Sequence, residues 1–357
     1  MNLNFFSRIF SKRSLGIDIG AFSIKIIELS SFGKKKKLEN YIKFSFPLKD
    51  SSLRMFHKES LNLLSENAAE VLNALFKKIK IKRGKAAFSL PDFSTFSTTF
   101  ALPPMTRTEV PQAIEFEARH YIPVPLSEVT FDWQIIEKKE IPPEVELKIL
   151  LVAIPKKVLW NFQKMVNLTQ IELKSMEAEV FGLIRSSIPE TLAEKAVCLV
   201  DMGWQSTTVN IVEKKTLKAS HSFDISSNSL TKDLSSSLKI GLEEAEKLKI
   251  KYGLDPKEKN INKIFLPRIN SLALEIKKIC EDFYQKEGRK VENVVLAGGT
   301  ATLFGLKEYL GAKLKKEVFL ADPFKDISFP SSLEPRLKKL GPSFAVAVGV
   351  ALMGLET

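Results

Sequence analysis

The sequence predicts a two-lobed α/β fold that arose by duplication, with a smaller α+β subdomain inserted into the first lobe. Three observations lead to this prediction: an internal strand–turn–strand repeat, a proline-punctuated stretch between the two copies, and a composition typical of globular proteins. The chain has 357 residues, of which 44% are hydrophobic and 27% charged. At roughly 100–200 residues per domain, it can form two or three domains that each bury a core.

The internal repeat is the most informative of these features. The motif DIGAFS begins at Asp18 and is echoed by DMGWQS, which begins at Asp201. Each copy follows an apolar run and precedes a β-rich run. Two copies of one strand–turn–strand unit predict two equivalent halves, each of which contributes one turn to a shared site.

The first half should begin with a β-hairpin, LGIDIG and SIKIIELS, followed by a strand at residues 41–46. A helix is expected next, because Leu72, Leu75, Phe76 and Ile79 have the i, i+3, i+4, i+7 spacing of one helical face. Short proline-punctuated runs start near residue 86, and a T-x-x-E pattern at Thr106 predicts the cap of another helix. Residues 130–136 and 147–154 read as strands of the inserted subdomain.

The second half repeats this order, with AVCLVDMG and TTVNIVE as strands, a helical region over residues 230–288 and a buried-type strand in VENVVLAGG. The predicted boundaries are 1–91 and 170–193 for the two parts of the first lobe, the latter including a connecting helix, and 92–169 for the insert. The second lobe comprises 194–225 and 291–357, with a small helical subdomain at 226–290.

Charge and cysteine usage exclude several classes of function. The net charge of +12 favours an anionic partner, but the lysines are scattered and no RNA-binding or helix-turn-helix signature is present, so no nucleic-acid partner is expected. Two cysteines without C-x-x-C spacing predict neither a disulfide framework nor a zinc site. No run approaches about 18 consecutive apolar residues. The leader MNLNFFSRIFSKR is either a short amphipathic contact to an anionic membrane or a frayed terminus.

The repeated turns have the chemistry of phosphate-binding loops. Glycine permits the turn, backbone N–H groups can cradle oxyanions, and an aspartate can hold hydrated Mg²⁺. Lys25 would add a positive charge to the first loop. One such turn is ordinary hairpin chemistry, whereas two in register favour a clamp around a phosphate chain. The run LAGGTA would either let a ligand approach the backbone closely or form a plain strand-to-helix turn.

These motifs, in this order, resemble the nucleotide site of the actin, heat-shock chaperone and sugar-kinase superfamily. Within it the chain is most similar to the PilM family of type IV pilus assembly, from about Ser14 to Leu355. The stretch YIPVPLSEV is the most family-specific part, since the phosphate loops alone would equally admit the cell-division family FtsA. The resemblance implies an actin-like fold of the duplicated, ribonuclease H-like type.

The resemblance also implies ATP and Mg²⁺ as ligands in a cleft between the lobes. The residues it assigns to nucleotide are Asp18, Gly20, Ser23 and Lys25 in the first loop, Asp201, Gly203, Ser206 and Thr207 in the second, Gly298, Gly299 and Thr300 in the adenosine motif, and Glu246 with Lys249 beside adenine and ribose. Asp18 and Asp201 would hold Mg²⁺ through water. Glu179 and Asp201 are the candidate catalytic residues, with Glu179 orienting the attacking water. Alternatively, Glu179 is an ordinary exposed glutamate of a helix. The alternative for Glu246 and Lys249 is a solvated ion pair on a helix surface.

Phe22 and Trp204 depart from the small residues usual in these loops. Binding through backbone amides tolerates such side chains better than hydrolysis does, because hydrolysis needs a placed water. The expectation is therefore ATP binding, with weak ATPase activity left open.

For partners, the resemblance implies a scaffold within the pilus assembly complex, at the cytoplasmic face of the inner membrane. A groove between the insert and the first lobe would receive the N-terminal cytoplasmic tail of a PilN-like inner-membrane protein. Residues 121–124 are either contacts for this peptide or ordinary core. Peripheral membrane association is expected, and self-association stays open. The rival hypotheses are an FtsA-like filament-forming division protein and a small-molecule kinase of the same superfamily.

Overall fold

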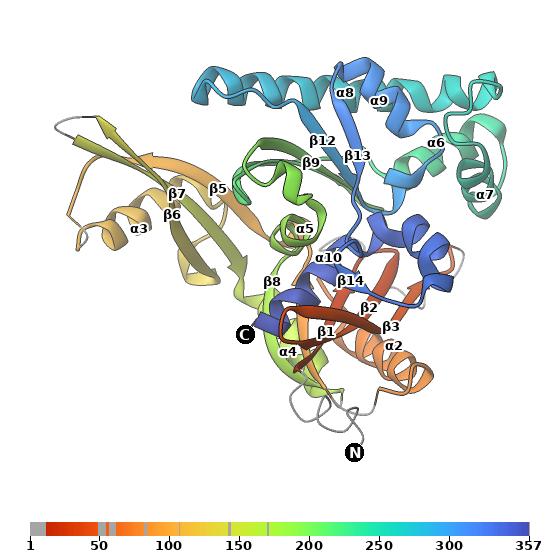
Figure 1. Cartoon of the computed structure of the whole chain (residues 1–357), viewed down its shortest axis with the longest axis horizontal. Coiled ribbons are helices and arrows are strands. Elements are labelled where there is room, and N and C mark those ends of the chain that lie inside the picture. The colour runs from red at the N-terminus through yellow and green to blue at the C-terminus, as the bar shows by residue number, and fades with distance from the viewer. Residues whose placement is uncertain are drawn as a thin grey trace.

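The computed structural model describes residues 12–48, 55–56, 62–81, 84–106, 108–141, 144–169 and 171–356. Most of the leader, on which the membrane-contact alternative rests, lies outside this range. Two sheets form two lobes, and a third, smaller sheet projects to one side of them (Figure 1).

The first lobe is built on a six-stranded sheet of order β14-β3-β2-β1-β4-β8. Strands β1, β2 and β3 form an antiparallel meander, and β4 and β8 continue the sheet parallel to β1. The strand bounds are β1 (Lys12–Ile19), β2 (Ser23–Phe32), β3 (Lys35–Ser45), β4 (Lys85–Leu90), β8 (Glu172–Ala178) and β14 (Ile327–Ser328).

The second lobe has a five-stranded sheet of order β11-β10-β9-β12-β13. It again joins a three-stranded antiparallel meander to two parallel strands. Its strands are β9 (Ala196–Met202), β10 (Thr207–Glu213), β11 (Thr216–Phe223), β12 (Asn293–Ala297) and β13 (Glu317–Leu320). The matching order in both lobes confirms the duplicated α/β fold that the repeat predicts.

Helices cover the outer faces of both sheets and fill the space between them (Figure 1). The helices are α2 (Ser65–Lys78) and α4 (Lys156–Asn167) on the first lobe, α6 (Ser227–Leu238), α7 (Leu242–Tyr252), α8 (Lys259–Glu287) and α9 (Leu306–Leu314) on the second, and α5 (Glu179–Ser187) and α10 (Glu334–Glu356) between the sheets. The predicted apolar stripe of α2 is buried against strands β1, β2 and β4, together with residues of α4.

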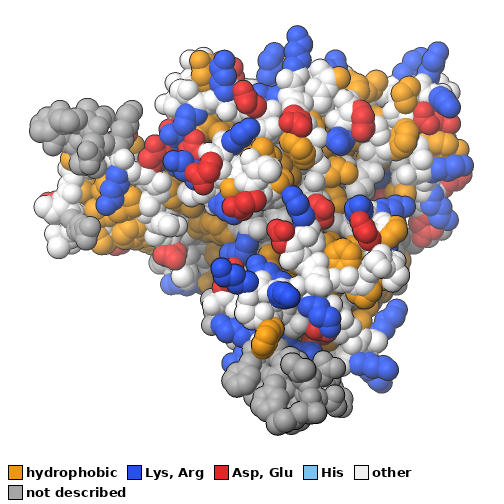
Figure 2. All heavy atoms as spheres, viewed as in Figure 1, with side chains coloured by type: hydrophobic (Ala, Val, Ile, Leu, Met, Phe, Trp, Pro, Cys, Tyr) orange, Lys and Arg blue, Asp and Glu red, His pale blue; other side chains and the backbone are white. Residues whose placement is uncertain are grey.

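The third sheet, of order β5-β7-β6, belongs to the projecting body. It comprises β5 (Phe96–Leu102), β6 (Val129–Ile141) and β7 (Glu144–Pro155), and α3 (Val110–Tyr121) shares a separate hydrophobic core with it. Figure 2 shows hydrophobic side chains gathered over this region, whereas lysine and arginine side chains are scattered over both lobes.

The start of α3 differs from the sequence-based expectation. The helix begins at Val110 rather than near Thr106, and the N–H of Thr106 donates to Oε2 of Glu109 at 2.7 Å in the preceding turn. Pro111 explains the difference, because proline lacks an N–H and is tolerated in the first helical turn but not further along.

The last helix is the main apolar element of the chain. The segment Ser331–Glu356 is long and apolar enough to cross a membrane by length and composition, but 78% of its most apolar window is buried inside the protein. It packs against β1 and β2 of the first lobe and, with α5, against β9 and β12 of the second. Such burial is that of a core helix.

Helices α5 and α10 cross so closely that only glycine fits at the crossing. A Cβ on Gly349 would lie 1.8 Å from the carbonyl oxygen of Gly182. Gly16 of β1 makes a similar approach to α10, since a Cβ there would lie 2.1 Å from the oxygen of Ala347. Backbone contacts of this kind fix the distance between the two sheets.

We predict that Gly349→Ala destabilises the protein by about 1–3 kcal/mol or more, because the methyl group forces the crossing helices apart. Gly311→Ala in α9 is the matched control, since its Cβ would find its nearest neighbours at 3.6 Å. Gly311→Ala should instead raise the free energy of unfolding by about 0.5–1 kcal/mol, the usual effect of replacing glycine by alanine inside a helix. Urea unfolding measures both variants, and equal stabilities would show that the crossing is not under this constraint.

Candidate functional site

A cavity of about 360 Å³ lies between the lobes and is lined by residues of both. The predicted site residues that line it are Asp18, Gly20, Ser23, Lys25, Glu179, Asp201, Gly203, Ser206, Glu246, Lys249, Gly298, Gly299 and Thr300. Thr207 is not among them: it is fully buried, and its hydroxyl donates to the carbonyl of Ile225. Its neighbour Thr208 lines the cavity instead, because successive residues of a strand point to opposite faces.

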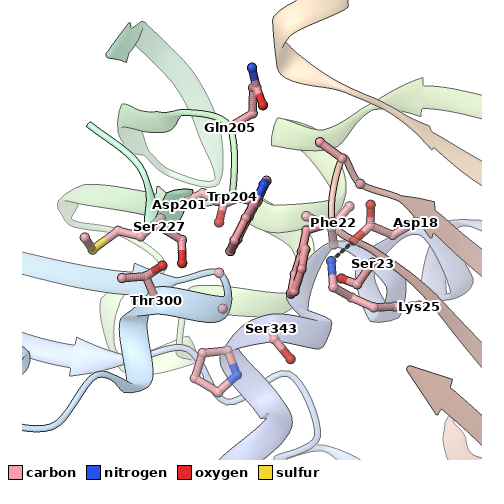
Figure 3. Close-up of a pocket in the computed structure, with 18 of the residues that line it drawn as sticks. Asp18, Phe22, Ser23, Lys25, Asp201, Trp204, Gln205, Ser227, Thr300 and Ser343 are labelled. Atoms are coloured by element: carbon pink, nitrogen blue, oxygen red, sulfur yellow. Dashed lines mark hydrogen bonds and ion pairs between the residues drawn. The ribbon is translucent and has the colours of Figure 1, made fainter. Parts of the chain in front are cut away.

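The two repeated turns have the same hydrogen bond. The N–H of Gly20 donates to the carbonyl oxygen of Ser23 at 3.0 Å, and that of Gly203 donates to the oxygen of Ser206, also at 3.0 Å. Each turn joins the first two strands of its lobe's meander, β1 to β2 and β9 to β10. In Figure 3 the two turns approach the cavity from opposite sides.

An ion pair organises the first turn. Nζ of Lys25 lies 2.6 Å from Oδ2 of Asp18, and the hydroxyl of Ser89 donates to the other oxygen of Asp18 at 3.2 Å. Asp18 and Lys25 are directly opposite each other in the β1–β2 register, so both project from the same face. Burial lowers the pKa of Lys25, but the charge of Asp18 and its hydrogen bond outweigh this, and the net shift is upward.

An aromatic stack connects the two turns. The rings of Phe22 and Trp204 lie face to face, with centroids 4.0 Å apart and planes inclined by 14° (Figure 3). Stacking of this kind contributes about 0.5–1.5 kcal/mol beyond the burial of area. The two bulky residues that depart from the usual loop pattern therefore contact each other across the cleft and tie the lobes together.

The second-lobe wall offers backbone and hydroxyl groups. Gly298 has a φ of +86°, and a Cβ there would lie 2.3 Å from Oδ1 of Asp201, so the position requires glycine. A Cβ on Gly299 would meet no atom within 4 Å, which leaves the backbone open to a ligand. The hydroxyl of Thr300 is buried and has no hydrogen-bond partner among the described residues. This wall can receive a polar ligand.

Lys249 and Glu246 form a buried pair beside the cavity, not a solvated one. Nζ of Lys249 lies 2.7 Å from Glu246, and it donates to the hydroxyl of Ser227 at 2.6 Å and to that of Thr231 at 2.8 Å. Burial lowers the pKa of Lys249 in spite of Glu246. Its amine also lies 5.4 Å from the ring centroid of Trp204. Lys249 therefore holds α6, α7 and the second turn together.

Asp92, Glu179 and Asp201 all line the cavity, and Asp92 has no motif around it that could identify it from sequence. The N–H of Asp92 donates to Oε2 of Glu179 at 3.2 Å. Burial raises the pKa of Asp92 to about 7, and Asp201 adds to this shift; burial also raises the pKa of Asp201 to about 6. The pKa of Glu179 is raised well above its ordinary value by burial and then by Asp92. Glu179, at the start of α5, is therefore a cleft residue.

The sequence also does not identify several other residues that line the cavity: Lys43, Ser45, Ser227, Lys339 and Ser343. They come from β3, α6 and α10, which approach the cavity only in the folded chain. Within the described ranges, no set of three or more His, Cys, Asp or Glu side chains forms a preformed metal cluster.

Two duplicated lobes with matching turns on either side of one cleft define an actin-like protein. Solved structures support this class. The structure of a "PilM-PilN type IV pilus biogenesis complex" matches 96% of this chain and 99% of its own, with a TM-score of 0.82 at 21% identity. EutJ from Carboxydothermus hydrogenoformans matches at a TM-score of 0.58 and 17% identity, over 96% of this chain and 89% of its own. MreB 5 of Spiroplasma citri, solved with AMPPNP, matches at 0.51 and 11%, over 96% of each chain.

The chain belongs to the family of type IV pilus assembly protein PilM, whose profile matches residues 16–355. More distant similarity links it to the cell-division protein FtsA. The FtsA of Streptococcus pneumoniae is 27% identical over 197 residues, and that of Rhizobium meliloti 22% identical over 233. These matches cover 49% and 58% of this chain and 42% and 51% of those proteins, so the chain spans about half the length of the curated relatives it matches.

Proposed function

We propose that this protein binds ATP with Mg²⁺ in the cleft and acts as a scaffold of type IV pilus assembly at the cytoplasmic face of the inner membrane. The observation that carries the proposal is the pair of equivalent glycine–serine turns, one from each lobe, that face a single cavity. Family membership supports the pilus role. The AMPPNP bound to MreB 5, which has the same fold, supports the choice of nucleotide.

The residues of the cleft fit a nucleotide. The unpartnered hydroxyl of Thr300 and the open backbone at Gly299 suit a nucleoside, and the turns with Lys25 suit a phosphate chain. Bound Mg²⁺ would neutralise phosphate charge, and Asp18 and Asp201 would hold it through its water ligands. Phe22 and Trp204 would stand beside the phosphates of a bound nucleotide, and their rings would have to separate or tilt for a phosphate chain to pass between the turns. For this reason we propose slow hydrolysis, with Glu179 as the residue that orients the water.

For the nucleotide we predict that Mg²⁺ strengthens ATP binding to the wild type and that Asp201→Ala weakens this dependence, because it deletes one of the two carboxylates that would hold the hydrated ion. Calorimetry with and without Mg²⁺ measures it. Asp132→Ala, which removes the same charge from an exposed position of β6, should behave as wild type. An absence of ATP binding, or an unchanged Mg²⁺ effect in the Asp201 variant, would contradict the assignment.

A second site is available for the partner. A cavity of about 520 Å³ lies between the projecting body and the first lobe, and it is lined by Phe93, Phe96, Ser127, Glu128, Lys157 and Val158 among others. Extended peptides in such clefts gain main-chain hydrogen bonds and apolar contacts. We propose that this groove receives the N-terminal tail of a PilN-like protein, since PilN is the partner in the PilM-PilN complex that shares this fold. Tyr121 does not line it: Tyr121 stacks on Phe100 and borders a different cavity, against β10 and β11.

One short helix borders both the nucleotide cavity and this groove. This helix is η1 (Asp92–Ser94), which follows β4 after Pro91. The side chain of Phe93 lines both sites, and the N–H of Asp92 is bonded to Glu179 in the cleft. A nucleotide that changes the position of Glu179 would therefore shift one wall of the groove.

The projecting body is also tied to the second lobe by charged side chains. Arg289 contacts Glu213 at 2.8 Å, Glu287 at 2.9 Å and Glu137 of β6 at 3.2 Å. Lys218 of β11 is 3.2 Å from the same Glu137. Since the body is covalently joined to the first lobe, movement between the lobes would change its angle and hence the groove. We propose this route for coupling nucleotide to partner affinity.

For the partner we predict that Ser127→Trp lowers the affinity for the tail peptide by about tenfold or more, because an indole would fill the groove, while ATP affinity stays unchanged. Ser332→Trp, at another exposed serine that does not line the groove, is the matched control. Asp18→Ala should abolish nucleotide binding and change peptide affinity by no more than the ~1–3 kcal/mol typical of allosteric coupling.

Fluorescence anisotropy of the labelled peptide, with and without ATP, measures all these variants. Binding that survives Ser127→Trp but is lost in Tyr121→Ala would move the site to the cavity beside β10 and β11. A wild type that binds no peptide in any nucleotide state would remove the scaffold role and favour an FtsA-like filament protein.

A further inference from the structure

A row of charged side chains crosses the first three strands of the sheet at the cleft. Asp18 of β1 is directly opposite Lys25 of β2, and Lys25 is directly opposite Lys43 of β3. Directly opposed residues in antiparallel strands project from the same face, with Cβ atoms about 4.5–5.5 Å apart. All three residues line the nucleotide cavity. Strand β3 therefore adds a wall that neither repeated turn contains.

The two lysines of this row differ in their partners. Lys25 is paired with Asp18 at 2.6 Å, whereas Lys43 has no ion-pair partner among the residues that the structure describes. Like charges on directly opposite residues destabilise a sheet, so the pairing of Lys43 with Lys25 carries a cost in the folded protein. Partial desolvation and the charge of Lys25 lower the pKa of Lys43 to about 8. A ligand with several negative charges would offset this repulsion.

Serines continue the same wall. Ser23 of the first turn is directly opposite Ser45 of β3, and both line the cavity. Hydroxyl and ammonium groups can both donate hydrogen bonds to phosphate oxygens, and the bond from an ammonium group is strengthened by its charge. The strand thus presents an anion-binding surface beside the turn that the repeat motif identifies.

We propose that Lys43 is a further phosphate ligand of the cleft and makes the protein prefer nucleoside triphosphates to diphosphates. The inference rests on the proposed nucleotide function and goes beyond it in assigning specificity to β3. Asp18 already neutralises Lys25, so Lys43 is the lysine of this wall whose charge is free to balance the phosphate chain. A triphosphate has one more negative charge than a diphosphate, so it gains more from that balance.

Calorimetry with Mg-ATP and Mg-ADP tests the proposal on three variants. Lys43→Gln should lower the affinity for ATP by about tenfold, because one positive charge beside the phosphate chain is lost. It should lower the affinity for ADP clearly less. Lys43→Arg should keep the preference. Lys35→Gln, at an exposed lysine near the start of the same strand, should match the wild type.

A melting curve of each free variant separates binding from folding. Lys43→Gln should melt no lower than the wild type, since it removes a like-charge contact. If the wild type binds both nucleotides and Lys43→Gln loses equal affinity for ATP and ADP, or loses none, the proposed role of Lys43 is wrong. The nucleotide site itself would still stand. A wild type that binds neither nucleotide would overturn the nucleotide function, and this inference with it.

Discussion

The crossing of α5 and α10 sets the geometry on which the rest of the molecule depends. At Gly182 and Gly349 the two helices meet backbone to backbone, and Gly16 lets β1 approach α10 in the same way. Because packed interiors resist local expansion, the spacing between the two sheets is fixed by these contacts. The cleft lies where α5 begins and where the two meanders turn, so the distance between the turns follows from that spacing.

The two lobes contribute different chemical groups to the cleft. The first lobe supplies Asp18, Lys25 and Lys43, and the second supplies Asp201, an open glycine backbone and the hydroxyl of Thr300. Asp92 and Glu179 also line the cleft, and burial raises the pKa of both. The Phe22–Trp204 stack bridges the walls with one aromatic ring from each turn. The charged groups suit a phosphate chain and a cation. The aromatic stack limits how freely a water molecule can align with the phosphate chain of a bound nucleotide.

The features of the fold and the cleft that can be predicted from the sequence are local ones. A repeated D-x-G turn is visible because its chemistry lies within six residues, and it correctly predicts duplicated lobes. Residues that reach the cleft only through the pairing of strands or the course of the chain have no local sequence motif. Lys43 faces Lys25 only once β2 and β3 pair. Asp92 reaches the cleft through a short helix after β4. Thr207 and Thr208 are neighbours in β10 whose side chains point to opposite faces of the sheet. Thr207 is buried away from the cavity, whereas Thr208 lines it.

The proposed function requires that the two turns form one site. Hydrogen–deuterium exchange with and without Mg-ATP tests it most directly, because it reports each turn separately. We expect slower exchange at residues 20–23 and at 203–206 together, with additional protection at 298–302. Protection confined to one turn, or an unchanged pattern at both while nucleotide is bound, would contradict it and place the ligand elsewhere.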